Sequence, residues 1–342
     1  MTTSGLFLEE TQALRGAWMR HDSEMLAEYL VQDVQDPRIN LASVLTRHTL
    51  LRELFGPRLR PLMQHELRFA AAMNWLWQYR RSCPGPCDAA ALLDALVERR
   101  TCAGSWEIPR VVHESFAILP CTVAGARIDN YIVRALLCHV NDCLRTPVAQ
   151  EVLATFERLW SQVLTRLEAA PLTVFEPACG SANDYRFLVS FGIARFLQYT
   201  GQDLCEKNVF NARRLFPDAA FEVGNAMCLD AADQSFECTF VHDLIEHLSP
   251  AAMDRTLAEL CRVTERTLLL GLFNMCHARE HTIVRCGPYY RNRLSAARLA
   301  EKLLDNGFGP CIVPIDRLVR ERFGHMPWYT QTAYVVIARR LT

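Results

Sequence analysis

The 342-residue sequence predicts an α/β fold, in which a mostly parallel sheet with helices on both faces follows an α-helical domain. From residue 6 to about residue 168, apolar residues recur at helical spacing, whereas after Pro171 short apolar segments alternate with amphipathic ones. Strands that alternate with helices are typical of a parallel sheet covered on both faces. The length suits two domains, which we place at 1–168 and 169–342.

The helical domain is predicted from several amphipathic runs that prolines and glycines separate. Examples are Ala89–Arg100, Ile128–Leu144 and a run that Pro147 opens and that ends near Leu167. A helical domain ahead of such a sheet can cover a pocket and exclude water. We therefore expect a lid or a dimerisation surface.

Seven apolar segments of the second half are predicted to be strands. They are Leu172–Phe175, Phe196–Thr200, Ala220–Val223, Cys238–Val241, Thr267–Phe273, Ile312–Ile315 and Ala333–Ala338. Amphipathic runs between them predict helices over Glu206–Phe216, Ala251–Val263 and Ala296–Leu304. The last strand follows soon after its predecessor and could turn back antiparallel at the sheet edge.

Composition excludes some classes of protein. The formal net charge is −1, so nucleic acid is not expected as a partner, because polyanion binders usually carry a basic surplus. No apolar run approaches the length of a membrane span. Fourteen scattered cysteines and no secretory leader favour the cytoplasm. Cys83 and Cys87 lack two further metal ligands and are interpreted as part of a surface turn.

Four segments stand directly after predicted strands, where parallel sheets bind ligands. The first is the turn Pro177–Asn183, whose small residues let a nucleotide lie against bare backbone ahead of a helix. Because alanine resists positive φ, Gly180 is expected to be the one left-handed residue there. The second segment, Gly201–Asp203, ends in Asp203, which follows Gly180 at the ~20-residue spacing of nucleotide-binding units and could bind ribose hydroxyls. The alternative for the first segment is an ordinary strand-to-helix turn, and the alternative for Asp203 is a helix N-cap.

The third and fourth segments are Gly224–Ala226 and His242–Leu248. The side-chain amide of Asn225 could hydrogen-bond a purine edge or stabilise a polar turn. The fourth segment carries four ionisable residues directly after an apolar strand, where groups that face a cleft are candidates for chemistry.

Together these segments resemble the motifs of class I, Rossmann-like methyltransferases that depend on S-adenosylmethionine. Glu176–Ala182 resembles the glycine-rich first motif in a variant with alanines, and Tyr199–Asp203 resembles the ribose-binding acidic motif. Gly224–Ala226, Phe240–Leu248 and Leu303–Phe308 are similar to the adenine, fourth-strand and late helix-to-turn motifs. The resemblance covers about half of the chain, residues 172–342. It implies a Rossmann-like seven-stranded sheet and S-adenosyl-L-methionine as cofactor.

The resemblance also implies a set of cofactor-binding residues. They are Glu176 and Gly180 at the methionine group, Asp203 at the ribose, Asn225 and Ala226 at the adenine, and in addition Ala178 and His242.

Methyl transfer from a sulfonium is an in-line displacement, so a base is needed only if the acceptor must lose a proton. A helix that begins near Asp243 would place Asp243, Glu246 and His247 on one face. His247 could then be a general base oriented by Asp243 or Glu246. Alternatively, the three could bind a divalent cation or only stabilise the fold, and no metal is predicted because no further ligands are assignable. The catalytic candidates are His247, Asp243, Glu246 and His242.

The segment after the fifth strand is polar, aromatic and locally basic, and in this architecture it is the usual place for acceptor recognition. Arginine binds carboxylates and phosphates through its planar guanidinium group, so a small carboxylate-bearing acceptor is preferred, with its O, S or N atom left open. The alternative is a solvated connection. The candidate residues are Arg285, Tyr289, Tyr290, Arg291, Arg293, His277 and His281.

Three other functions stay open. A nicotinamide oxidoreductase would need a third glycine where Asp184 and Tyr185 stand. The chain could also be a non-catalytic, methyltransferase-like binding or assembly protein, or a methyltransferase that acts on RNA or protein. The preferred prediction is a cytoplasmic enzyme that methylates a small molecule and could form a homodimer.

Overall fold

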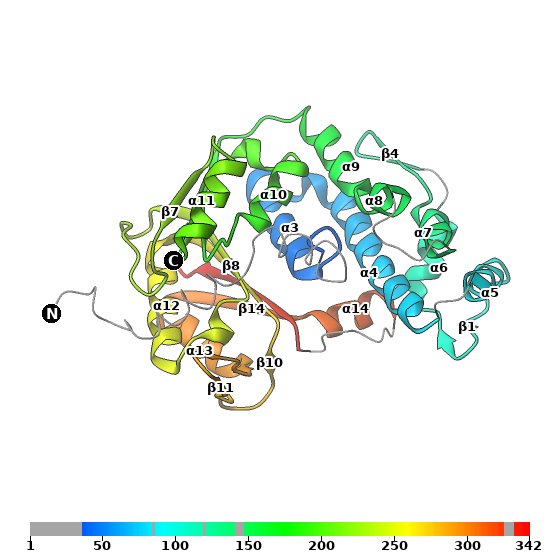
Figure 1. Cartoon of the computed structure of the whole chain (residues 1–342). Helices are drawn as coiled ribbons and strands as arrows, with labels where there is room; N and C mark the ends of the chain where they lie inside the picture. The colour runs from blue at the N-terminus through cyan, green and yellow to red at the C-terminus, as the bar shows by residue number, and fades with distance from the viewer. Residues whose placement is uncertain (1–35, 84–85, 119–120, 141–146, 325–331) are drawn as a thin grey trace.

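The computed structural model describes residues 36–83, 86–118, 121–140, 147–324 and 332–342 (Figure 1). A seven-stranded sheet in the order β14-β15-β9-β8-β5-β6-β7 forms its centre. The strands are β5 (Leu172–Pro177), β6 (Leu197–Asp203), β7 (Ala220–Val223), β8 (Phe236–His242), β9 (Thr264–Leu272), β14 (Phe308–Pro314) and β15 (Tyr334–Arg340). Each strand overlaps one predicted segment, and the predicted fold class is confirmed.

The strand order opens a crevice beside β5. From β5 the chain adds β6 and β7 on one side and then crosses over to form β8 on the other, all in parallel. Such a reversal leaves a binding crevice outside the carboxyl ends of the two central strands. β15 is antiparallel, as expected, but it lies between β14 and β9 rather than at the sheet edge.

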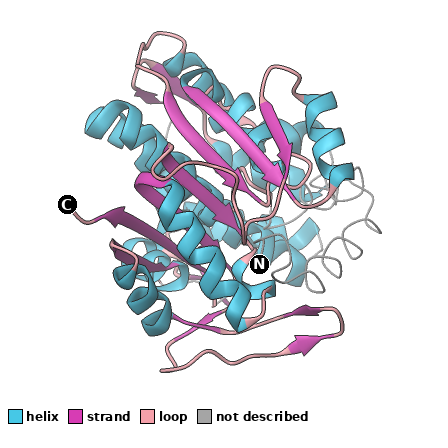
Figure 2. Ribbon diagram, turned by 90° about the vertical axis from the view of Figure 1, so that its left-hand side faces the viewer, coloured by secondary structure: helices cyan, strands magenta, loops and turns pink. Residues whose placement is uncertain are grey.

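Helices cover both faces of the sheet (Figure 2). They include α10 (Asn183–Ser190), α11 (Glu206–Leu215), α12 (Pro250–Val263), α13 (Ala296–Asp305) and α14 (Ile315–Phe323). The predicted positions of α11, α12 and α13 agree with the structure to within one residue at each end, whereas α14 was not predicted. The connection from β9 to α13 contains four two-residue strands, β10 (Met275–Cys276), β11 (Arg285–Cys286), β12 (Tyr289–Tyr290) and β13 (Leu294–Ser295).

The described part of residues 36–168 is mainly helical. Its helices are α3 (Leu41–Phe55), η2 (Gly56–Leu59), α4 (Arg60–Ser82), α5 (Pro86–Val97), α6 (Arg110–Ala117), α7 (Tyr131–Val140), α8 (Pro147–Leu153) and α9 (Thr155–Leu164). Two hairpins interrupt them, β1 (Cys102–Ala103) with β2 (Trp106–Glu107) and β3 (Cys121–Val123) with β4 (Ala126–Ile128). The hairpins were not predicted, and the run after Pro147 divides into two helices. The apolar spacing before residue 36 lies outside the described residues.

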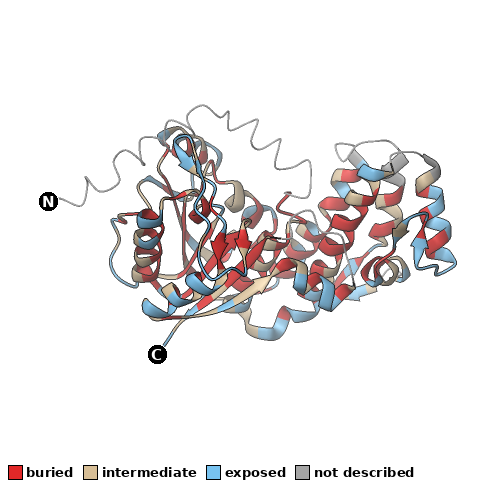
Figure 3. Ribbon diagram, turned by 90° about the horizontal axis from the view of Figure 1, so that it is seen from below, coloured by how far each residue is buried: buried red, intermediate tan, exposed pale blue. Residues whose placement is uncertain are grey.

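The helical part and the sheet share one hydrophobic core. Leu50 of α3, Trp75 of α4 and Trp160 of α9 belong to the same buried cluster as Val174 of β5 and Phe240 of β8. Buried residues continue from the sheet into the helical part (Figure 3). α3 packs against β9 and β15, so this helix of the first half forms part of the layer on the sheet.

A buried polar network fixes α3 to the neighbouring helices. The fully buried Glu66 carboxylate accepts hydrogen bonds from Arg47 at 2.8 Å and from the Trp160 indole at 2.5 Å, and it lies 2.7 Å from His48 Nε2. Burial favours the neutral acid, but Arg47 and His48 outweigh it and lower the pKa of Glu66 to about 2. The carboxylate is therefore ionised and holds the middle of α3 in place.

No helix in the described part of the chain is both long and apolar enough to cross a bilayer.

Candidate functional site

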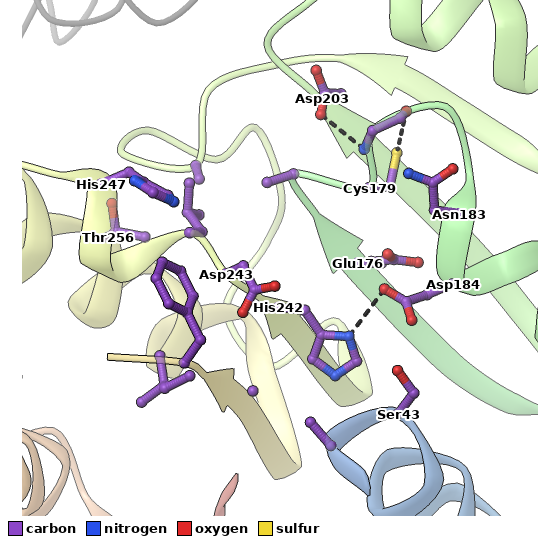
Figure 4. Close-up of a pocket in the computed structure, with 18 of the residues that line it drawn as sticks. Ser43, Glu176, Cys179, Asn183, Asp184, Asp203, His242, Asp243, His247 and Thr256 are labelled. Carbon is purple, nitrogen blue, oxygen red and sulfur yellow. Dashed lines mark hydrogen bonds and ion pairs between the residues drawn. The ribbon is translucent and has the colours of Figure 1, made fainter. Parts of the chain in front are cut away.

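A cavity of about 300 Å³ lies at the crevice that the strand order predicts. It is bordered by the residues after β5, β6 and β8, by the end of β9 and by the first turn of α3 (Figure 4). Of the predicted cofactor and catalytic residues it includes Glu176, Ala178, Gly180, Asp203, Asn225, Ala226, His242, Asp243 and His247. Elements from both halves of the chain therefore build one site.

The turn after β5 has three left-handed residues at alternate positions. Ala178, Gly180 and Ala182 have φ values of 59°, 57° and 65°. The expectation that only Gly180 would be left-handed is therefore wrong. A left-handed alanine costs roughly 1–2 kcal/mol, and the surrounding fold supplies that energy. Ala182 is fully buried in the shared core, which explains how its conformation is held.

Asp203 closes the turn from the neighbouring strand. One carboxylate oxygen accepts from the Gly180 N–H at 2.9 Å, and the other accepts from the Cys205 N–H at 2.8 Å and the Asn208 amide at 3.1 Å. Burial raises the pKa of Asp203 in spite of these three donors. A carboxylate oxygen has two lone pairs, so the oxygen bonded to Gly180 can still accept from a ligand hydroxyl, whereas the other oxygen already accepts two hydrogen bonds.

Asn225 and Ala226 border the cavity beyond Asp203. The Asn225 side-chain oxygen accepts from the Met227 N–H at 3.0 Å, which closes the loop after β7. The polar-turn interpretation of Asn225 is therefore correct for its oxygen.

Two acids, the buried Glu176 and the partly exposed Asp184, lie between the turn and α3. Glu176 accepts a hydrogen bond from the Tyr199 hydroxyl at 2.5 Å, and burial, with a smaller contribution from nearby Asp184, raises its pKa well above the usual range. Asp184 instead lies 3.0 Å from His242 Nδ1. Burial opposes its ionisation, but His242 outweighs this and lowers the pKa of Asp184.

His242 connects the sheet to the helical part. Its Nδ1 pairs with Asp184, and its Nε2 lies 3.0 Å from the Thr46 hydroxyl on α3. Burial alone would lower the pKa of His242, yet Asp184 raises it overall, so the two residues form an ion pair. His242 is thus held at both nitrogens and borders the cavity.

Asp243 has a left-handed backbone, with φ 52°, and its side chain is exposed to the cavity. Because protein encloses it and Asp184 lies nearby, its pKa rises to about 6.

Glu246 faces away from the cavity. It is fully buried, its Oε1 accepts from the Phe273 N–H at 2.7 Å, and its Oε2 has no partner in the described structure. Burial and the charge of Asp243 raise the pKa of Glu246 to about 8. The expected single helical face with Asp243 and His247 does not form, because residues 245–247 make one 3₁₀ turn, η4 (Ile245–His247).

His247 borders the cavity and is oriented by backbone rather than by Asp243 or Glu246. Its Nδ1 lies 3.0 Å from the carbonyl oxygen of Tyr290, and since a carbonyl only accepts, Nδ1 carries the hydrogen. Nε2 is then the acceptor nitrogen. Burial lowers the pKa of His247, so the ring is neutral near pH 7.

Residues 174–267 match the family model of a methyltransferase domain, from within β5 to within β9. This region contains the turn after β5, Asp203 and the fourth-strand motif. The chain therefore contains a methyltransferase domain over residues 174–267. No curated protein matches the sequence.

The chain is similar to several solved structures. One is a SAM-dependent methyltransferase from Methanosarcina mazei, with 16% identity, 52% of this chain and 97% of that chain covered, and a TM-score of 0.40. Another is 1,6-didemethyltoxoflavin-N1-methyltransferase from Burkholderia thailandensis with bound 1,6-didemethyltoxoflavin and S-adenosylhomocysteine, with 18% identity, 54% and 78% covered, and a TM-score of 0.38.

The predicted acceptor residues of the methyltransferase lie outside the cavity. Arg285, Arg291 and Arg293 are exposed in the β10–β13 connection, and none borders the cavity. The remaining four are used within this connection or beside His247. His277 bonds Tyr334 at 2.9 Å, His281 accepts from Ser295, the Tyr289 ring packs 5.9 Å from His247, and Tyr290 orients His247.

Within the described residues, no group of three or more His, Cys, Asp or Glu side chains is arranged to hold a metal ion. The three residues weighed for a divalent cation do not converge, since Glu246 binds the backbone behind the cavity.

Several cavity residues were not among the predicted site residues. Asp184 stands in the sequence directly after the turn, and its pairing with His242 required knowledge of the strand order. Asn40 and Ser43 come from α3, and Phe273 from the end of β9. No sequence pattern links α3 to the sheet, so only the fold reveals its contribution.

Proposed function

We propose that this methyltransferase transfers the methyl group of S-adenosylmethionine to a small, uncharged or cationic acceptor inside the described cavity. The observation that supports this most is the charge of the lining. Asp184, Asp203 and Asp243 border the cavity beside the neutral Glu176, and the described lining contains no Arg or Lys. Such a lining favours a cation, and the donor carries a sulfonium and an ammonium group.

The lining fits the cofactor at the turn after β5. Asp203 would accept from a ribose hydroxyl through the remaining lone pair of the oxygen bonded to Gly180, and Asn225 with Ala226 would border the adenine. The left-handed backbone at Ala178 and Gly180 keeps side chains away from the cofactor, as glycines do in related turns.

S-adenosylmethionine supplies an electrophilic methyl group, which the acceptor takes as the carbon–sulfur bond breaks and a neutral sulfide leaves. The protein must exclude water and hold the acceptor in line with that bond. Leu248, Leu272 and Phe273 border the cavity on the side of His247 and supply an apolar wall. The buried Thr256 hydroxyl lies beside His247 and has no partner among the described residues (Figure 4).

His247 is the proposed general base. Its hydrogen is fixed on Nδ1 by Tyr290, so Nε2 is free to take a proton from an acceptor N–H or O–H. Asp243, with a pKa near 6, is ionised at neutral pH and would stabilise the imidazolium that forms. Glu246 would act only by holding the backbone of Phe273.

The acceptor class differs from the one that the sequence favoured. The arginines that suggested a carboxylate are exposed outside the cavity, and an acidic lining would repel an anion. We therefore propose a neutral or cationic acceptor with a removable proton. Every described cysteine is a free thiol, which supports the predicted cytoplasmic location.

Calorimetry with S-adenosylmethionine, S-adenosylhomocysteine and NAD tests the cofactor assignment. We expect the first two to bind and the Asp203→Asn variant to bind them at least tenfold more weakly, because a charge-assisted hydrogen bond is worth about 1.5–3 kcal/mol. Asp230→Asn, an exposed residue outside the cavity, is the matched control. Tight binding of NAD alone would overturn the assignment. Labelled methyl donor incubated with metabolite extracts would then identify the acceptor.

A further inference from the structure

The β10–β13 connection reaches the segment that carries His247, although its arginines lie outside the cavity. The carbonyl oxygen of Tyr290, on β12, lies 3.0 Å from His247 Nδ1. β12 pairs with β11 in a separate sheet of two short strands. Because a two-stranded hairpin by itself is only marginally stable in water, the position of this carbonyl group needs further support.

Asn292, two residues after Tyr290, provides this support. It is fully buried. Its backbone N–H donates to the Glu246 carbonyl oxygen at 2.8 Å, and its side-chain amide donates to the Leu248 carbonyl oxygen at 2.6 Å. These two carbonyl groups flank His247 in the chain. One residue of the connection thus binds the backbone on both sides of the imidazole.

The remaining polar groups of Asn292 bind two other segments. Its side-chain oxygen accepts from the Val284 N–H at 3.2 Å, just before β11. Its carbonyl oxygen accepts from the Asn274 amide at 2.8 Å, just after β9. Buried polar groups are almost always hydrogen-bonded, and a satisfied buried network makes the local structure rigid. Asn292 therefore joins the end of β9, the β11–β12 hairpin and the turn η4.

The neighbours of Asn292 in the sequence face the other way. Arg291 and Arg293 are exposed, whereas Asn292 between them is buried, as expected for extended backbone whose side chains alternate. The basic composition of the connection thus belongs to its outer side, and the contact with the turn belongs to its inner side.

The contact determines which ring nitrogen of His247 carries the hydrogen. A neutral imidazole has one N–H, and the hydrogen lies on the nitrogen whose partner can only accept. Neutral histidine in water prefers the hydrogen on Nε2. The Nδ1–H form therefore depends on the Tyr290 carbonyl group staying in place.

We propose that Asn292 is a positioning residue for His247, which holds the turn η4 against β12 and so keeps the Tyr290 carbonyl oxygen at Nδ1. Nε2 then stays without a hydrogen and can accept a proton. The use of Nε2 as a base rests on the proposed function, whereas the position of the hydrogen does not.

Imidazole ¹⁵N NMR of histidine-labelled protein tests the proposal, because protonated and unprotonated ring nitrogens have well-separated shifts. The chain has ten histidines, so the loss of signals in His247→Gln assigns those of His247. At pH 7.5 the wild type should carry the hydrogen on Nδ1, since burial lowers the pKa of His247 and the ring is neutral. In Asn292→Leu the hydrogen should move to Nε2.

Methyl transfer from labelled donor into metabolite extracts should also become slower in Asn292→Leu. We expect a loss of about 10–10²-fold, because a displacement of about 1 Å can cost a catalytic group roughly 10²-fold in rate. The affinity for S-adenosylhomocysteine should change less than twofold.

Asn74→Leu is the matched control. Asn74 on α4 is also fully buried, and its amide donates to the carbonyl oxygens of Ile39 and Ala70 at 2.7 and 2.8 Å. This variant loses comparable hydrogen bonds away from His247 and should keep the hydrogen on Nδ1.

A hydrogen on Nε2 in the wild type, or one that stays on Nδ1 in folded Asn292→Leu, would overturn the proposal. If Asn292→Leu does not fold, Val284→Pro decides in the same way, because it removes only the N–H that binds the Asn292 side-chain oxygen. Movement of the hydrogen in Asn74→Leu would also overturn it, by indicating a general loosening. Movement in Asn292→Leu without slower methyl transfer would support the positioning by Asn292 and remove His247 as the proposed base.

Discussion

Glu176 and Asp184 border the same cavity, yet their environments favour opposite protonation states. Burial and nearby Asp184 keep Glu176 neutral, and its hydrogen-bond partner is the uncharged Tyr199. Asp184 is ionised because His242 contributes a positive charge 3.0 Å away. Residue type alone therefore does not define the charge of the site, and each carboxylate has to be judged by its partners.

The same reasoning gives His247 a measurable role. His247→Ala should lower kcat by about 10²–10⁴-fold, the usual contribution of a general base, and change affinity for S-adenosylhomocysteine less than twofold. Because burial lowers the pKa of His247 and the base must be unprotonated, wild-type kcat should rise with pH through a value below about 6.5. Steady-state kinetics from pH 5 to 8 measure both effects.

His113→Ala is the matched control for this experiment, since His113 lies on α6 and does not border the cavity. Full turnover in His247→Ala would remove the imidazole from the mechanism and leave proton loss to solvent.

The raised pKa of Glu246 predicts that the stability of the protein depends on pH. Its pKa of about 8 in the folded protein exceeds the unfolded value of about 4.5, so the folded state binds the proton more tightly. The stabilisation is complete below the unfolded value and is lost as pH rises toward 8. Glu246→Gln keeps an oxygen for the Phe273 N–H and should flatten this dependence. Urea unfolding at pH 5.5 and 8.5 measures the free energy of unfolding of the wild type and of Glu246→Gln. An equal change between the two pH values in both proteins would contradict the raised pKa of Glu246.

At the level of elements, the pairing of β8 with β9 positions His242. His242 lies opposite Gly271 in this pairing, and a Cβ added to Gly271 would stand 2.3 Å from the imidazole Cδ2. Gly271→Ala should therefore displace the ring from Asp184 and Thr46. We expect a loss of about 1–3 kcal/mol in unfolding free energy, as for other overpacked sites. Urea unfolding measures the loss, and histidine NMR shifts report the ring.

Gly309→Ala is the control for this strand substitution. A Cβ there would meet the end of the flexible Leu341 side chain at 3.0 Å, which can move aside. A loss as large as that of Gly271→Ala would show that the sheet, rather than His242, is sensitive to the added methyl group.

The accuracy of the element predictions depends on length. All seven main strands and three helices were predicted, because each has enough residues for its apolar period to be visible. The two-residue strands β1, β2, β10 and β11 carry no such period. The 3₁₀ turn at residues 245–247 was also missed, because three residues cannot distinguish it from the start of an α-helix. Because of this 3₁₀ turn, Glu246 does not share a face with Asp243 and His247, as the prediction had it.

At the level of the whole molecule, the two halves share one core, so they should unfold together. The described tryptophans, Trp75, Trp77, Trp106 and Trp160, all lie in the helical part. In a Trp328→Phe variant, tryptophan fluorescence should change at the same urea concentration at which S-adenosylhomocysteine binding is lost, because α3, β5 and β8 belong to one buried cluster. Two separated midpoints would show that the predicted domains are independently stable.

The part of the candidate site at the strand ends could be predicted from the sequence, whereas the part from α3 could not. Turn residues, Asp203 and the fourth-strand group lie at strand ends, which the order of elements already brings to one edge. Ser43 and Thr46 reach that edge only because α3 packs on β9 and β15. The arginines of the β10–β13 connection are the opposite case. Their locally basic sequence suggested a binding site, but none of them borders the cavity.

The acidic residues of the cavity affect how the demethylated product leaves the enzyme after each turnover. S-adenosylmethionine enters with a net charge of +1, and the demethylated thioether that remains is neutral overall. A site lined by Asp184, Asp203 and Asp243, with Glu176 neutral beside them, thus attracts the fresh donor, and this attraction weakens once the methyl group has gone. Inhibition by the spent thioether should accordingly be weak at low ionic strength, where that preference is strongest.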